Sequence, residues 1–126
     1  MKKFLIASCV ALALPTAAFA DVAAQLTVAE QHAGFAAKAG NTIDQVHMHL
    51  HHVLNCLVGP SGAGFDAAPG NPCAKAGTGA VAEADAAVKV KLTPAVAAAT
   101  AGIAASDVAA AQAEAGKAAA AIAAAK

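Results

Sequence analysis

Apolar residues recur at helical spacing along most of this chain, and this pattern predicts an all-α protein. Residues 21–39 form the first predicted helix, with Asp21 as a candidate N-cap and Gly40 as a stop. Its larger apolar side chains are Val22, Leu26, Val28 and Phe35. Alanine fills many of the other positions, so helix propensity is high while little apolar surface is available for burial.

The second predicted helix covers residues 42–58 and has the clearest end signals. The candidates for its capping box are Asn41 or Thr42, followed three residues later by Asp44 or Gln45. Gly59 and Pro60 end the pattern. This helix carries most of the histidines of the chain.

Glycine, proline and asparagine dominate residues 59–79, which predicts a long loop. A third helix is expected at 80–92, and Thr93-Pro94 is typical of a helix start, with proline at the first helical position. An alanine-rich C-terminal helix is then expected at about 94–125. The predicted fold is a small four-helix (or three- to four-helix) bundle with one long, disulfide-stapled Gly/Pro loop.

The N-terminal 20 residues have the pattern of a cleaved secretory signal. Lys2 and Lys3 precede an apolar run, and Ala18-Phe19-Ala20 provides small residues for cleavage after Ala20. The run is too short for a membrane span, which needs roughly 20 residues. Cleavage before Cys9, as in a lipoprotein, would leave an apolar region of only about five residues. We therefore expect one small helical domain at 21–126, periplasmic or secreted, with no membrane span.

Two cysteines, Cys56 and Cys73, remain after the predicted cleavage. In an oxidising compartment they are expected to pair with each other. The bridge would close a loop of about 17 residues, and the chain-entropy model assigns such a loop about 3 kcal/mol of stabilisation. For a small, alanine-rich domain that contribution is large.

The charge balance argues against nucleic acid as a partner. Loss of Lys2 and Lys3 would leave six lysines against eight acidic residues, and the chain has no arginine. There is also no tryptophan or tyrosine to stack on bases. A basic stripe for phosphates is therefore missing from the sequence.

Four of the five histidines fall in the run His47-Met48-His49-Leu50-His51-His52. Imidazole is the commonest metal ligand in proteins, and it also titrates near neutral pH. The cluster therefore suggests a metal site or a pH-sensitive charge. Cu(II), Zn(II) and Ni(II) suit imidazole ligands, and copper and zinc are the leading candidates.

On a helical wheel the bulky residues of 42–58 fill one stripe and the histidines lie on its two flanks. His47 and His51, spaced i, i+4, share one flank with Asp44, which could act as a ligand or orient an imidazole. His49 and His52 lie on the opposite flank. One ion cannot bind all four, so those two would serve a second site or one completed by another helix or chain. His32 of the first helix is the expected third ligand for His47 and His51 if the two helices pack antiparallel.

Other interpretations of the histidines remain open at this level. They can be solvated boundary residues, hydrogen-bond the adjacent loop, or sense pH; a haem site is disfavoured because no C-x-x-C-H motif is present. No pattern for a nucleophile elbow or a phosphate-binding loop occurs, so we expect no enzyme. The predicted function is sequestration, transport or sensing of copper or zinc. The alternative is a metal-free structural protein of the cell envelope, acting as a homo-oligomer or with a partner through its C-terminal helix.

Overall fold

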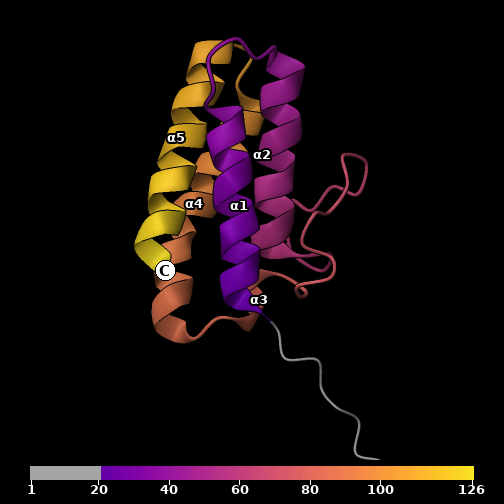
Figure 1. Cartoon of the computed structure of the whole chain (residues 1–126), viewed down its shortest axis with the longest axis vertical. Coiled ribbons are helices and arrows are strands. Elements are labelled where there is room, and N and C mark those ends of the chain that lie inside the picture. Colours follow the sequence, from indigo (N-terminus) through magenta and orange to yellow (C-terminus); the bar gives the residue numbers. More distant parts are fainter. Residues whose placement is uncertain (1–20) are drawn as a thin grey trace, which may run out of the picture.

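The computed structural model describes residues 21–126, and the predicted signal sequence at 1–20 lies outside these residues. Five helices and no strand occur in the described part: α1 (Val22–Ala36), α2 (Ile43–Val58), α3 (Ala80–Glu83), α4 (Ala86–Ala104) and α5 (Val108–Ala125). The four long helices run alternately up and down, and the short α3 lies near their lower end (Figure 1). The predicted all-α class is confirmed.

The predicted capping residues begin the first two helices. The Asp21 carboxylate accepts a hydrogen bond from the backbone N–H of Ala24 at 2.8 Å. Thr42 and Gln45 form a reciprocal capping box at the start of α2. Each cap satisfies backbone N–H groups that have no partner within the helix. Gly59 ends α2 with a positive φ of 68°.

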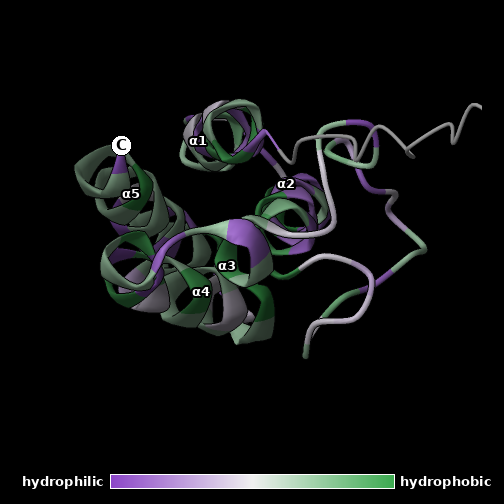
Figure 2. Ribbon diagram, turned by 90° about the horizontal axis from the view of Figure 1, so that it is seen from below, coloured by the Kyte–Doolittle hydropathy of each residue, from purple (hydrophilic) through white to green (hydrophobic). Residues whose placement is uncertain are grey.

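Seen end-on, the four long helices surround a common interior (Figure 2). The bulky side chains of this core include Leu50, Leu57, Leu92 and Ile122, all fully buried. The rest of the core is largely alanine. Small side chains let the helix backbones approach closely, so the packing is tight although each residue buries little apolar area.

The helices after residue 80 differ from the prediction. α4 continues through Pro94, so Thr93-Pro94 does not begin a helix. Pro94 cannot donate to the carbonyl of Val90, but Val90 is 73% exposed, which places this turn at the surface. Buried Leu92 and Ala95 on either side of the proline hold the helix against the core.

The true boundaries in this region are set by two aspartates. Asp85 caps α4 by accepting from the N–H of Val88, and Asp107 caps α5 by accepting from the N–H of Ala110, both at 2.9 Å. The predicted helices at 80–92 and 94–125 are therefore replaced by α3, α4 and α5. Asp85 and Asp107 are ordinary N-cap residues that the sequence contains, but the prediction gave more weight to Thr93-Pro94 as a helix start.

Residues 59–79 contain no helix and lie beside the lower half of α2 (Figure 1). The Cys56–Cys73 disulfide joins this segment to α2, as the cysteine count predicted. The two ends of the segment meet closely: a Cβ atom on Gly59 would lie 1.6 Å from the carbonyl oxygen of Thr78. Glycine is required there because the second backbone occupies the space of a side chain.

Among the described helices, α4 alone is long and apolar enough to meet the composition criteria for a membrane span. The buried core helix of a globular domain can have the same length and composition. Leu92, Ala95 and Ala99 of α4 are fully buried within this chain.

Candidate metal centre

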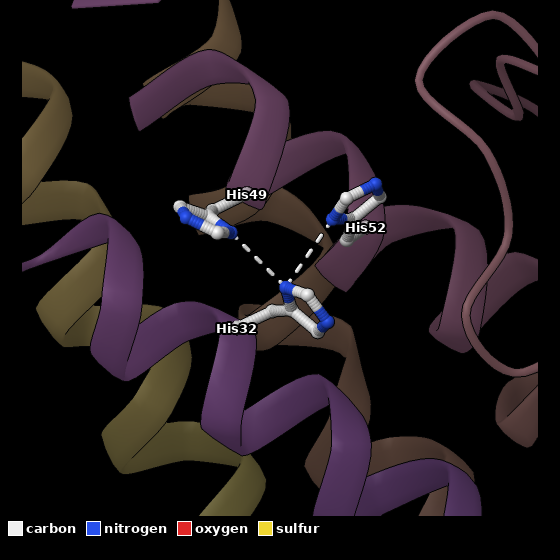
Figure 3. A group of neighbouring side chains, drawn as sticks. All are labelled: His32, His49 and His52. Atoms are coloured by element: carbon white, nitrogen blue, oxygen red, sulfur yellow. Dashed lines mark hydrogen bonds between the residues drawn. The ribbon is translucent and has the colours of Figure 1, made fainter. Parts of the chain in front are cut away.

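Three histidines from two helices converge at one point between α1 and α2 (Figure 3). The Nδ1 atom of His32 on α1 lies 3.1 Å from Nδ1 of His49 and 3.2 Å from Nδ1 of His52, both on α2. One ring nitrogen from each residue can be chosen so that all three atoms lie within 4.8 Å of one another. This group could hold a metal ion. We call it the histidine cluster.

The antiparallel pairing of α1 and α2 creates this cluster. The chain reverses at Gly40, which has a positive φ of 89°, and Asn41 donates from its side chain to the carbonyl of Phe35 at the end of α1. His49 and His52 are spaced i, i+3, so their side chains project from neighbouring positions on α2. His32 faces them from α1.

Phe35 forms part of the wall around the cluster. Its ring meets the His32 ring edge-on, with centroids 5.7 Å apart and planes at 84°, and lies 5.5 Å from the His49 ring. Phe35 is 44% exposed and the three histidines are partly buried. The cluster therefore lies at the edge of the core, where an ion has access from solvent.

The outer nitrogen of His52 is fixed by a loop. Its Nε2 atom lies 2.7 Å from the carbonyl oxygen of Pro69. A carbonyl only accepts, so Nε2–H of His52 donates this bond. The neutral His52 ring then carries its proton on Nε2, and its Nδ1 presents a lone pair to the cluster. Histidine ligands of metal ions commonly donate their second N–H to a backbone carbonyl in this way.

The inner nitrogens cannot satisfy one another in the neutral state. Nδ1 of a neutral imidazole either donates one proton or accepts with one lone pair. If Nδ1 of His32 accepts a proton from His49, the lone pair of His32 also faces the lone pair of His52. If Nδ1 of His32 is the donor, its single proton is shared between His49 and His52 as two acceptors. A cation at the centre would interact favourably with three lone pairs at once.

The cluster favours neutral imidazoles. Burial, with the nearby His52 and His49 rings, lowers the pKa of His32 from 6.5 to about 4. Burial and His52 also lower the pKa of His49. Desolvation and neighbouring like charges both disfavour the protonated form. At neutral pH His32 and His49 are therefore in the form that binds metal.

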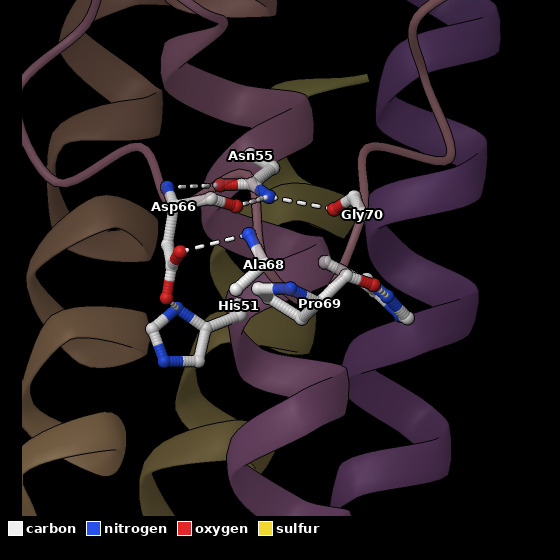
Figure 4. A network of polar contacts seen from close by, with 7 residues as sticks. His51, Asn55, Asp66, Ala68, Pro69 and Gly70 are labelled. Atoms are coloured by element: carbon white, nitrogen blue, oxygen red, sulfur yellow. Dashed lines mark hydrogen bonds and ion pairs between the residues drawn. The ribbon is translucent and has the colours of Figure 1, made fainter.

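The structure places His47 and His51 apart from this cluster. Nε2 of His47 lies 2.9 Å from the carbonyl oxygen of Ala105, at the end of α4. Nδ1 of His51 is buried without a hydrogen-bond partner and lies 3.8 Å from a carboxylate oxygen of Asp66 (Figure 4). Asp44 is exposed in the first turn of α2.

The structure does not group His47 and His51 with His32, and shows instead the alternative arrangement, in which another helix completes the flank of His49 and His52. His32 is a cluster member, as expected, but its partners are His49 and His52 and not His47 and His51. The helical wheel separated the two flanks correctly. It could not tell which flank faces α1, and the familiar i, i+4 spacing favoured the other pair.

Comparisons with protein-family models, with curated proteins and with solved structures find no match to this chain. Its function is therefore inferred from the residues of the cluster themselves.

Proposed function

We propose that this protein binds copper or zinc through His32, His49 and His52, in the periplasm or outside the cell, and thereby sequesters, carries or senses the ion. The observation that carries the proposal is the convergence of three Nδ1 atoms, with His32 at 3.1 and 3.2 Å from its two partners. Metal–imidazole bonds of about 2.0–2.1 Å in a tetrahedral site place the nitrogens roughly 3.3 Å apart. The two distances from His32 are close to this separation, and the ligand atoms of all three residues lie within 4.8 Å of one another.

Three imidazoles leave one position of a four-coordinate ion for water or an exogenous ligand. The partial exposure of the cluster is consistent with such an open position. The ligand set favours Cu(II) or Zn(II), because imidazole suits both ions and neither the disulfide-bonded cysteines nor a carboxylate joins the cluster. An accessible ion with an exchangeable ligand suits sequestration or transfer.

Localisation outside the cytosol is part of the same proposal. The disulfide supports it, because such bonds persist in oxidising compartments. The signal-like pattern of residues 1–20 supports it independently.

The metal-free alternative assigned the C-terminal helix to a partner. α5 buries Ala111, Ala115, Ala118 and Ile122 within its own chain, so the face that carries its bulkiest side chain is already packed in the core. This observation favours the metal-binding proposal.

The test is calorimetric titration of the purified, disulfide-bonded protein with Cu(II), Zn(II) and Ni(II). The variant His32→Ala/His49→Ala/His52→Ala should lose binding that the wild type shows in the submicromolar range. The variant His47→Ala/His51→Ala is the control, since it removes two histidines that lie on the same helix but do not belong to the cluster. Equal binding by all three proteins, or loss only in the control, would refute the assignment.

A further inference from the structure

We propose that residues 66–70, which we call the orienting loop, set the metal affinity of the histidine cluster by holding the His52 ring, and that Asn55 is the positioning residue that holds this loop. The inference rests on the proposed metal site. The loop supplies the Pro69 carbonyl that accepts from Nε2–H of His52 at 2.7 Å. His52 is thus the ligand that the loop can control.

Asn55 binds both ends of the orienting loop (Figure 4). Its side-chain amide donates to the carbonyls of Asp66 at 2.6 Å and Gly70 at 2.7 Å. Its side-chain oxygen accepts from the N–H of Asp66 at 3.0 Å. Asn55 is completely buried on α2, one turn from His52, so one rigid helix carries both the ligand and the anchor of its orienting loop.

Hydrogen bonds within the loop fix its shape. The Asp66 carboxylate accepts from the N–H of Ala68 at 2.9 Å, and the N–H of Gly70 donates to the carbonyl of Ala67 at 3.1 Å. Gly70 has a positive φ of 95°, a conformation that favours glycine. This turn directs the Pro69 carbonyl toward His52.

The disulfide holds the loop from its other side. Cys56 is the residue after Asn55, and Cys73 lies three residues beyond Gly70. Cys73 is itself buried, and its N–H donates to the side chain of Asn71 at 3.0 Å. Asn55 and Cys56 therefore attach the same segment to the same turn of α2.

The energetic consequence follows from the role of the carbonyl. The Pro69 carbonyl keeps the His52 proton on Nε2 and the lone pair on Nδ1, and it limits rotation of the His52 ring. Loss of such an outer contact typically weakens metal binding by about 10- to 100-fold. Releasing the loop should have this effect although no metal ligand is changed.

The experiment measures Zn(II) affinity by competition with a chromophoric chelator, for the wild type, Asn55→Ala and Cys56→Ser/Cys73→Ser. Both variants should bind about 10- to 100-fold more weakly. Leu92→Ala is the control for general destabilisation, because Leu92 is a buried residue of α4, a helix that supplies no residue to the histidine cluster or to the orienting loop. It should bind like the wild type.

A second measurement separates orientation from folding. Nitrogen-15 NMR of the metal-free protein should show His52 protonated on Nε2 in the wild type and a mixture of tautomers in Asn55→Ala. If Asn55→Ala fails to fold, Asp66→Ala is the substitute, because Asp66 is partly exposed and its carboxylate holds the turn through the N–H of Ala68. This variant should show the weaker Zn(II) binding and the mixed His52 tautomers to a smaller extent.

The outcomes distinguish this inference from the metal site itself. If the wild type binds Zn(II) and the loop variants bind equally well, with His52 unchanged, the orienting role is wrong and the site remains. If the wild type binds none of the tested ions, both proposals fall.

Discussion

The Nδ1 atom of His32 lies 3.1 Å from that of His49, although the two residues belong to different helices. A metal ion bound between them would join α1 to α2, and the unfolded chain has no such arrangement. Ligands that bind only the native state stabilise it by about 2.7 kcal/mol when their free concentration is 100 times Kd.

We therefore expect Zn(II) to raise the thermal unfolding midpoint of the wild type, and a chelator to reverse the shift. Circular dichroism during heating measures both. His32→Ala should abolish the shift and His47→Ala should retain it. Equal shifts in the two variants would contradict a site at the cluster.

The lowered pKa of His32 predicts a pH dependence for the metal-free protein. The unfolded chain takes up this proton near pH 6.5, whereas the native protein resists it until about pH 4. The unfolded state therefore binds more protons within this window, and native stability falls as the pH is lowered through it. His49 shifts in the same direction.

Urea unfolding at about pH 7 and about pH 5 should give a lower free energy of unfolding at the more acidic value. His32→Gln should reduce the difference, because one of the two shifted groups is removed. A wild-type stability that does not change across the window would show that protonation of the cluster is not disfavoured.

Two glycines inside helices should respond oppositely to the same substitution. A Cβ atom on Gly116 of α5 would meet nothing within 4 Å, whereas one on Gly102 of α4 would lie 2.6 Å from Cδ1 of Leu50. Gly116→Ala should stabilise the protein by about 0.5–1 kcal/mol, because alanine loses less backbone entropy in a helix. Gly102→Ala should destabilise it by about 1–3 kcal/mol through overpacking. Chemical unfolding measures both, and a gain in stability for Gly102→Ala would contradict the close contact of α4 and α2.

Gln25 is completely buried and connects α1 to the end of the long loop. Its side-chain oxygen accepts from the N–H of Gly79 at 3.0 Å, and its amide donates to the Glu83 carboxylate at 2.6 Å. Gln25→Ala leaves these groups unsatisfied and should cost about 1–3 kcal/mol. Gln31→Ala, at an exposed position of the same helix, is the matched control and should change little. Similar effects of the two substitutions on the free energy of unfolding would argue against the buried network.

Much of the fold could be predicted because its signals are local. The ends of α2 follow from Thr42, Gln45 and Gly59, each of which acts on backbone groups within one turn. Pro94 misled the prediction because proline is favoured at a helix start and costs about 3 kcal/mol inside a helix, whereas the burial of Leu92 and Ala95 keeps it inside α4. That choice depends on packing against other helices, which no local window contains.

The sequence by itself determined the all-α class, the first two helices, the Cys56–Cys73 pairing and the presence of a dense histidine run on two flanks of one helix. The tertiary structure decided which flank faces α1, and with it that His49 and His52, and not His47 and His51, meet His32. Helix periodicity places side chains around one axis. The rotation of the helix about that axis, which decides the flank that faces each neighbour, is set by the sum of all core contacts. The cluster depends on that rotation.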